Sequence, residues 1–411
     1  MRELSRVKIV FANGALGSVT PSDDGVVGLI ASGSAVPDKF ALEKPYQITE
    51  LGDLKGLGIT AGTNKTIYDT VTQFYTEAPK GTNLWLMGVA DTVKVSEVFD
   101  ENPDDDESKY YVRNLIEASN CSINLLIVKK NPQSDTANRT ISGETGELVL
   151  DADVYEAMGK AHNLATAITN ELFAPFFVLL EGRHYDPSKD VLKDLAKYEF
   201  NRVGILVADV EPDTKGACVG LLAGRIASIP VQRSIARVKT GAIKNSAMYI
   251  GKKTVQNGKP ERLHSLGYIT ARTFVGKAGY YWSDDLLATQ VADDYALIPR
   301  RRIIDKAYRI AYKTLVEEVG EEIPVTDAGE IPAPIAKSIQ NKVERAIQSN
   351  MTNFGNLGND PSNANDIGVT CYIDPKQNIM SDSRLEIQIR VKPYAYAKYI
   401  NVSLGFKVVG A

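Results

Sequence analysis

The chain has 411 residues, of which 44% are hydrophobic and 24% are charged. This length exceeds what one core usually supports, so two or three domains are expected, and the composition excludes a globally disordered protein. The net charge is only −4 and no block is rich in Lys or Arg, so neither nucleic acid nor a membrane surface is expected as a direct partner.

The N-terminus and the cysteines bear on where the protein is made. Residues 1–8 lack the apolar centre of a signal peptide, and no apolar run reaches the roughly 18 residues of a membrane-spanning helix. Cys121, Cys218 and Cys371 are widely spaced and odd in number, which indicates buried free thiols. We therefore expect a protein that is made in the cytoplasm and leaves it, if at all, within a larger particle.

Strand-like and helix-like segments alternate through the first half of the chain. Residues 7–11 form a short strand-like arm, and residues 46–55 a short strand followed by one helical turn. Apolar runs typical of buried strands occupy residues 26–31, 83–89, 123–128, 176–181 and 203–208. Helical spacing of apolar residues predicts helices at residues 66–77, 151–172, 188–200 and 219–226. This order predicts an α/β domain with a mixed, largely parallel sheet.

The second half has a different order, and predicts an α+β unit. A glycine- and lysine-containing connector at residues 238–259 precedes short strands at 268–275 and 279–282. Long amphipathic helices follow at residues 299–319 and 334–350, with Pro334 suited to the first turn of the second helix. Antiparallel strands are expected to close the chain.

The closing stretch shows the clearest strand pattern in the chain. Apolar and polar residues alternate over residues 385–392, and again over residues 400–408, which predicts two strands of a closing hairpin. Terminal residues fray unless they are held, so the last strand must pair either inside its own sheet or with another chain.

Few segments suggest catalysis or ligand binding. The glycine-rich residues 56–66 have the wrong spacing for a phosphate-binding or dinucleotide loop, and we interpret them as a loop that starts a helix. The acidic residues 100–107 lack the glycine and closing glutamate of a calcium loop, and a solvated loop is the simpler interpretation. His162, His184 and His264 stand apart from other metal-binding side chains. We therefore expect no metal and no cofactor.

Two polar clusters leave alternatives open. Residues 182–186, which include His184, follow a predicted strand and are the best enzymatic candidate, although a strand-end loop is the simpler interpretation. Arg300, Arg301 and Arg302 open a helix whose dipole they oppose. Their charge must be compensated either by nearby acids of the same chain, at positions 284, 285, 293 and 294, or by a neighbouring chain.

Four passages together resemble the contractile tail sheath proteins, the subunits of the sleeve around the tube of contractile phage tails, pyocin-like particles and related injection systems. These passages are residues 45–54 with 72–75 and 83–89; the Gly-Ala-rich residues 219–225; residues 268–274, 279–285 and 295–312; and residues 369–380 with the two closing strands. The likeness runs from residue 26 to the end and preserves order and spacing. The proline-rich segment between the two domains of the family is reduced here to residues 227–231, and the short chain suggests a minimal sheath.

The resemblance implies a structural protein and not an enzyme. Sheath subunits stack as hexameric rings around an inner tube and contract cooperatively, without nucleotide hydrolysis, to drive the tube through an envelope. The implied organisation is an N-terminal arm (residues 1–20), an outer α/β domain (21–240), an inner α+β domain facing the tube (241–397) and a C-terminal arm (398–411). The implied partners are further copies of the chain, the tube protein, and baseplate and tail terminator proteins, first in the bacterial cytoplasm and then in the particle.

Two sets of residues take roles under this resemblance. The arms would donate strands to neighbouring subunits, because main-chain hydrogen bonds survive large rigid-body movements. The strand-exchange candidates are Val7, Ile9, Phe11, Ile400, Val402, Leu404 and Phe406. The predicted helix at 334–350 carries a basic face that could grip an acidic tube, or could simply be solvated; it consists of Lys337, Asn341, Lys342 and Arg345.

Two other functions compete with the sheath. One is a non-contractile structural ring, such as a baseplate component. The other is an α/β enzyme that uses the loop around His184.

Overall fold

The computed structural model describes residues 23–101, 109–132, 136–363 and 365–405. The chain divides into two compact units, Met1–Arg309 and Ile310–Ala411. The boundary between these units lies further along the chain than residue 240, after which a domain boundary was expected. The helix α7 (Ile298–Leu315) contributes residues to both units.

The first unit is built on a six-stranded sheet with the order β2-β3-β1-β4-β5-β7. The strands β3, β1, β4, β5 and β7 are parallel, and β2 is antiparallel at the edge. When the five parallel strands are numbered along the chain, their order across the sheet is 2-1-3-4-5, which is a known order for doubly wound α/β folds. The expected mixed α/β architecture is confirmed. The bounds are β1 (Val27–Ser32), β2 (Pro45–Ile48), β3 (Leu84–Val89), β4 (Leu125–Lys129), β5 (Phe177–Glu181) and β7 (Val203–Leu206).

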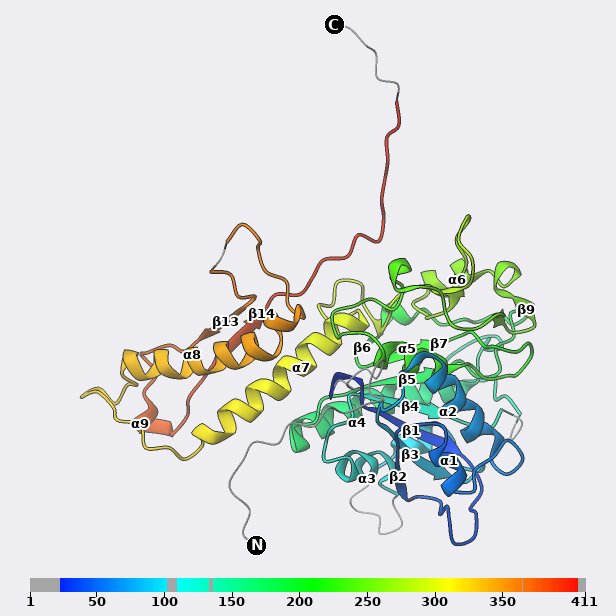
Figure 1. Ribbon diagram of the computed structural model, residues 1–411, viewed down its shortest axis with the longest axis horizontal. Coiled ribbons are helices and arrows are strands. Elements are labelled where there is room, and N and C mark those ends of the chain that lie inside the picture. Colours follow the sequence, from blue (N-terminus) through cyan, green and yellow to red (C-terminus); the bar gives the residue numbers. More distant parts are fainter. Residues whose placement is uncertain (1–22, 102–108, 133–135, 364, 406–411) are drawn as a thin grey trace, which may run out of the picture. The chain divides into compact units, whose positions relative to one another are not determined.

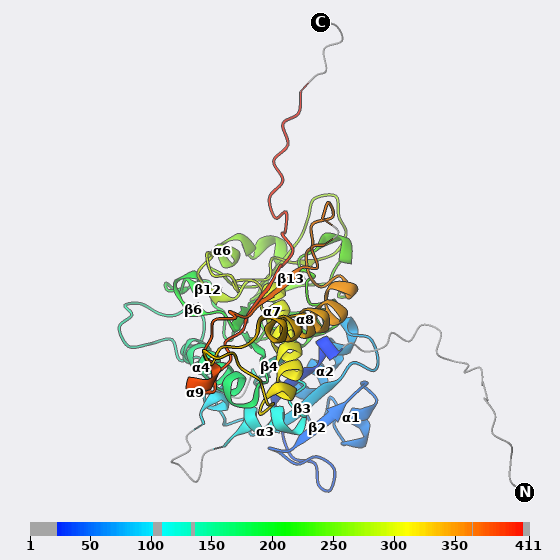
Figure 2. The same cartoon turned by 90° about the vertical axis from the view of Figure 1, so that its left-hand side faces the viewer.

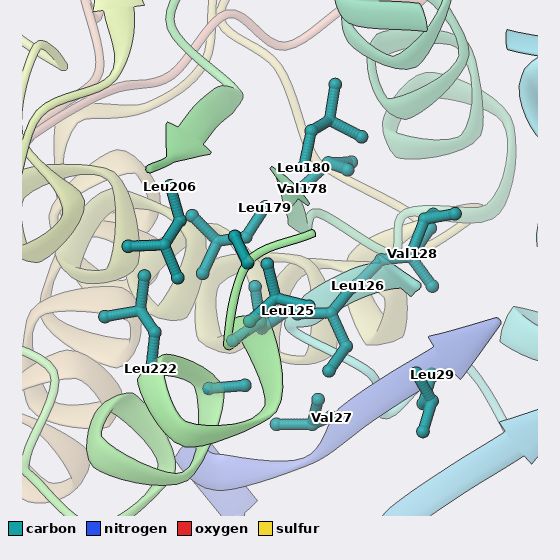
Figure 3. Packing of buried hydrophobic residues seen from close by; sticks show 14 of the residues in the cluster. Val27, Leu29, Leu125, Leu126, Val128, Val178, Leu179, Leu180, Leu206 and Leu222 are labelled. Carbon is teal, nitrogen blue, oxygen red and sulfur yellow. The ribbon is translucent and has the colours of Figure 1, made fainter. Parts of the chain in front are cut away.

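The central strands are apolar along their whole length because both faces of the sheet are covered. Every residue of β1 and of β5 is buried. Such strands lose the apolar–polar alternation of a half-exposed sheet. Figure 3 shows part of this core, including Leu126 of β4, Leu179 of β5 and Leu222 of the helix α5.

Two pairs of helices cover the sheet (Figure 1). The crossover from β1 to β3 runs in the opposite direction to those from β3 to β4 and from β4 to β5, so right-handed connections place their helices on opposite faces. The helices α2 (Lys65–Glu77) and α5 (Val219–Ala227) pack together on one face. The helices α3 (Tyr111–Ala118) and α4 (Ala152–Leu172) cover the other face.

The Gly-Ala-rich helix α5 packs so closely against α2 that two of its glycine positions have no room for a Cβ atom. A Cβ atom on Gly220 would clash with the carbonyl oxygen of Thr70 in α2, and one on Gly224 would clash with that of Phe74. The buried Arg225 then donates from Nε and Nη2 to the carboxylate of Glu77, at 2.9 and 3.0 Å. The two helices are therefore joined by backbone proximity and by a buried ion pair.

The second unit pairs helices with a small antiparallel sheet. Its long helix α8 (Ala333–Asn350) packs against β13 (Val369–Tyr372), which pairs with β14 (Gln388–Val391). A small core forms around Ile331, Ala336, Ile339 and Ile373.

The remaining elements are short. In the first unit they are α1 (Asp53–Gly56), α6 (Pro260–Ser265), β6 (Glu199–Phe200), β8 (Tyr249–Ile250), β9 (Lys253–Thr254), β10 (Ala271–Arg272), β11 (Tyr281–Trp282), β12 (Ala288–Thr289) and the 3-10 turns η1 (Asp23–Gly25), η2 (Ser96–Phe99), η3 (Leu195–Lys197), η4 (Val238–Thr240) and η5 (Val255–Asn257). In the second unit they are α9 (Ile379–Asp382), η6 (Val316–Glu318) and η7 (Thr352–Phe354). The helices α3 and α6 were not expected from the sequence.

The helix predicted at residues 188–200 is wrong. Val191 instead forms a parallel bridge with Leu148, and its carbonyl accepts from the N–H of Val149. Only the turn η3 follows, with Asp194 accepting from the N–H of Ala196. Pairing with a distant segment replaces the local helical preference.

The closing hairpin is also wrong as predicted. β14 pairs with β13, and residues 399–405 form no regular structure. The strand predicted at 268–275 is shortened to β10, and Ile269 forms a separate bridge with Leu206 at the end of β7.

Candidate functional site

The loop at residues 182–186 joins a buried polar cluster at the carboxyl ends of β4 and β5. The Glu181 carboxylate accepts from Lys129 Nζ at 2.6 Å, from the N–H of Lys130 at 2.8 Å and from Arg183 at 3.2 Å. The side chains of Glu181 and Arg183 are at most 1% exposed. Burial acts to raise the pKa of Glu181, but Lys129 and Arg183 hold it below its ordinary value. The cluster therefore keeps its charges paired.

His184 is enclosed by the same cluster. Its Nε2 lies 3.9 Å from Oδ2 of Asp151, and its carbonyl accepts from Arg139 at 2.9 Å. A Cβ atom on Gly216 would lie 2.6 Å from Lys129 Nζ, so space beside the cluster is already filled. Doubly wound sheets usually bind ligands at this edge. Here the groups satisfy one another, as in a structural network.

The arginines at the start of α7 find partners within the chain. Arg301 donates to both carboxylate oxygens of Asp305, at 2.6 and 3.1 Å, four residues along the same helix. Arg302 donates to the carbonyl of Ile229 at 3.1 Å. Arg301 is thus paired within the chain, with Asp305, which was not among the acids expected, and Arg302 bonds to backbone carbonyls. Nε of Arg300 is buried and lacks a hydrogen-bond partner among the described residues.

Further basic residues of α7 hold the loops that lead into the strands. Lys306 donates to the carboxylate of Asp24 at 2.7 Å. Arg309 donates to the carbonyls of Cys121, Ile123 and Pro175, the last two at 2.7 and 2.8 Å. This part of α7 therefore belongs firmly to the first unit.

The helix α8 separates an apolar side from a basic side. Its buried residues include Ala336, Ile339, Val343 and Ile347. On the other side Lys337, Lys342 and Arg345 are exposed and Asn341 is half-buried, so the predicted basic face exists.

One lysine of this face is already paired. Lys342 Nζ lies 2.6 Å from Glu318 and 3.1 Å from Glu317, and these hydrogen bonds raise its pKa. No ion pair to Lys337 or Arg345 is found in the part of the chain that the structure describes. The spare positive charge of the face is therefore carried by those two residues.

An open groove of about 640 Å³ extends the basic face within the second unit. Lys313 lies on one side of it and Arg345 on the other, with the small residues Ala346 and Ser349 also lining it. Lys313 was not a predicted site residue; only its position near the end of a helix could have suggested it.

Only some of the strand-exchange candidates lie among the residues that the structure describes. Ile400, Val402 and Leu404 are exposed over 78%, 79% and 94% of their surface. Val7, Ile9, Phe11 and Phe406 lie outside the described residues. The exposed segment follows β14 in the chain and contains no helix or strand (Figures 1 and 2).

The described ranges contain neither a candidate membrane span nor a candidate metal cluster. None of their helices combines the length and the apolar character that a membrane span needs. No group of three or more His, Cys, Asp or Glu side chains there could hold a metal ion. The three cysteines are free, with Cys218 and Cys371 buried and Cys121 partly exposed.

Two family models account for nearly all of the sequence. The DUF2586 N-terminal domain matches residues 4–286, and the DUF2586 C-terminal domain matches residues 294–410. No curated protein sequence matches the chain significantly.

Several solved structures share its fold. The helical sheath of the anti-feeding prophage in its contracted state superposes with a TM-score of 0.62 at 16% identity, over 99% of this chain and 100% of that chain. The contracted sheath of an extracellular contractile injection system, PVC, gives 0.59 at 12% identity, over 99% of both chains. A sheath tail protein from Desulfitobacterium hafniense gives 0.51 at 11% identity, over 90% of this chain and 94% of that chain. The likeness covers both units.

Proposed function

The chain belongs to the DUF2586 family and has the fold of contractile sheath proteins, and we propose that it is the structural subunit of a contractile sheath. The observation that carries this proposal is the shared fold over essentially the full length of both chains. Two features of the chain support it: an exposed apolar segment at residues 399–404, and a polar cluster around Glu181 whose charges are paired internally.

In this proposal the subunits stack as hexameric rings around an inner tube and shorten together. No nucleotide is hydrolysed, because the free energy resides in the packing between subunits. N- and C-terminal arms donate strands to neighbouring copies and keep the polymer connected while the compact parts move. Baseplate and tail terminator proteins bind the ends of the sleeve. The subunit is made in the bacterial cytoplasm and works in the particle.

The basic face of α8 is the proposed contact with the tube. Lys337, Lys342 and Arg345 are exposed on one side of a helix whose other side is buried, so the helix can present charge without disturbing its own core. An acidic tube surface would complement it, and rim charges of this kind tune association and release more than they tune fold stability.

Electron microscopy of negatively stained protein tests the main proposal. The purified chain, alone and mixed with its proposed tube protein, should form striated hollow cylinders. Single flat rings that never stack would favour the non-contractile alternative, which a similar chain in the baseplate of the anti-feeding prophage makes worth testing. Uniform small particles in every condition would overturn both.

A charge-reversal experiment tests the tube contact. Replacing Lys337, Lys342 and Arg345 by Glu should leave the subunit folded and prevent assembly on tubes. The matched control reverses three exposed lysines of the first unit, Lys239, Lys253 and Lys277. Equal assembly of the two triple variants on tubes would remove α8 as the contact.

A further inference from the structure

The segment between α5 and Asp284 carries charge of almost one sign. Residues 228–283 contain ten Lys or Arg residues and one acid, Glu261, whereas the whole chain has 47 basic and 51 acidic residues. Nine of the ten cations are exposed, and we call them the basic cap: Arg237, Lys239, Lys244, Lys252, Lys253, Lys259, Arg262, Arg272 and Lys277. They are widely spaced along the chain, so no run of cations in the sequence reveals them.

The fold gathers this segment at one end of the first unit, around α6 (Figures 1 and 2). β8 pairs with β9, and the N–H of Val255 in the following turn η5 donates to the carbonyl of Met248. β10 pairs with β11 and contacts η5. The N–H of Ile243 donates to the carbonyl of Tyr280, which joins the beginning of the segment to its end. The basic cap therefore belongs to one folded surface of the first unit.

Most of the basic cap has no counter-charge within the chain. Lys252 lies 3.5 Å from the carboxylate of Asp213, and both side chains are exposed. The other eight cations of the cap form no ion pair in the part of the chain that the structure describes. A surface of this kind has a positive potential and attracts anionic partners.

An apolar side chain projects from the same surface. In the loop that joins β10 to β11, the N–H of Lys277 donates to the carbonyl of Phe274 and closes a tight turn. Val275 lies in this turn and is fully exposed. The guanidinium carbon of Arg272 lies 4.2 Å from the centre of the Phe274 ring, and the ring of Tyr281 makes an edge contact with Phe274 at 5.3 Å. The turn therefore presents Val275 from a packed base, between two cations.

Cations around an exposed apolar tip fit the surface of an anionic bilayer. Lysines near such a surface strengthen binding by their charge, and apolar side chains gain by entering the boundary between head groups and acyl chains. The phosphates of a nucleic acid would also attract the cations, but they offer no apolar layer to Val275. The tip therefore favours lipid over nucleic acid as the partner.

We propose that the basic cap and Val275 bind the surface of a bilayer with anionic head groups. The contact is peripheral, and it goes beyond the proposed function because it concerns the first unit and not the tube. A membrane surface was not expected from the sequence, since the cations of the cap form no block there.

Vesicle flotation of the full-length chain tests the charge of the cap. The protein should float with vesicles of phosphatidylglycerol and phosphatidylcholine in equal parts, and should not float with phosphatidylcholine alone. Replacing Lys239, Lys253 and Lys277 by Glu should weaken binding at least about tenfold, because each lysine near an anionic surface adds to the attraction. Equal flotation of the wild type with both kinds of vesicle would overturn the proposal.

The triple Glu variant of α8 described above is the matched control for this experiment. It changes the net charge of the chain by the same amount, but outside the cap, so it should float as the wild type does. Circular dichroism and thermal melting confirm that both variants are folded. Equal losses of flotation in the two variants would mean that net charge, and not the cap, governs binding, and would overturn the proposal.

The substitution Val275→Ser tests the apolar tip. It should weaken binding to the anionic vesicles roughly tenfold, the effect of keeping one valine side chain in water. Val291→Ser is the control, because Val291 is also exposed but lies outside the cap, next to Asp293 and Asp294. Flotation of Val275→Ser that equals flotation of Val291→Ser would overturn the bilayer contact in favour of a general surface for polyanions such as nucleic acid.

These outcomes separate from those of the sheath proposal. The lysine variant of the cap should still assemble on tubes while it no longer floats with vesicles. Cylinders built by a protein that never floats would retain the sheath and reject the bilayer contact. Flotation of a protein that never builds cylinders would do the reverse.

Discussion

The candidate sites of the two compact units differ in whether their charged side chains are buried and paired or exposed and unpaired. In the first unit, charged side chains are buried against partners: Arg225 with Glu77, and Lys129 and Arg183 with Glu181. In the second unit, Lys337 and Arg345 are exposed without an ion pair among the described residues. Buried paired charges fix one arrangement, whereas exposed charges are available to other molecules. Under the proposed function, the first unit would act as a scaffold and the second would contact other molecules.

The largest effect on the free subunit is expected from Arg225→Ala. The substitution leaves the Glu77 carboxylate buried without its ion-pair partner, which typically costs about 3–5 kcal/mol. Chemical denaturation of the subunit measures it. Lys65→Ala, which removes an exposed i,i+4 pair with Asp69, should cost less than about 0.5 kcal/mol. Similar losses in the two variants would contradict the contrast between buried and exposed charges.

A smaller loss is expected from Gly224→Ala. The new methyl group clashes with the Phe74 carbonyl oxygen, so α5 must move away from α2, and overpacking of this kind costs about 1–3 kcal/mol. Gly56→Ala is the control, because nothing lies within 4 Å of its Cβ position. The same denaturation experiment should show the control unchanged or slightly stabilised; a stable Gly224→Ala protein would mean that the two helices are not held at backbone contact.

An effect confined to acid is expected from Glu181→Gln. The pKa of Glu181 is lowered in the folded state, so its contribution to stability is complete above the unfolded value of about 4.3 and is lost as the pH falls through the folded value. The wild type should therefore exceed Glu181→Gln in stability at pH 7, and the difference should narrow below about pH 4.3.

The difference in stability between the wild type and Glu181→Gln separates the effect of Glu181 from those of Asp151 and Asp209. Burial raises the pKa of both aspartates, so their contributions to stability change with pH in the opposite direction. Denaturation at several pH values measures the difference. Glu147→Gln, at an exposed pair with Lys189, serves as the control and should show little pH dependence. A constant difference across pH for Glu181→Gln would contradict the assigned ion pair.

Much of the first unit could be predicted from sequence because its signals are local. Continuous apolar runs gave β1, β3, β4, β5 and β7 within two residues at each end, and helical spacing gave α2 and α4. The predicted helix at residues 188–200 failed because Val191 pairs with Leu148, a contact that no local pattern reveals. The partner of Arg301 was missed although Asp305 lies four residues away, a spacing that favours ion pairs on helices.

The candidate site was predictable in part. The basic face of α8 followed from helical spacing, and Lys337, Lys342 and Arg345 are exposed. The closing strands were placed by alternation, but the alternation cannot name a partner, and β14 pairs with β13 and not with residues 400–408. The hydrogen bonds of Gln340 and Glu344 to the backbone of Ile373 and Cys371 could not be predicted, because they depend on where β13 lies in the fold.

The smallest effect on the free subunit, with the largest effect on assembly, is expected from deletion of residues 399–411. The described part of this segment, residues 399–405, is exposed, so its removal should change the free energy of unfolding by less than about 0.5 kcal/mol. If the segment joins neighbouring copies, the truncated protein should no longer build cylinders. A full-length control with Ile400→Ser, Val402→Ser and Leu404→Ser keeps the chain length and removes the apolar face, and should fail in the same way under the electron microscope. Cylinders built by the truncated chain would show that the closing segment does not hold copies together, whereas a large loss of stability on truncation would place it within the fold of its own subunit.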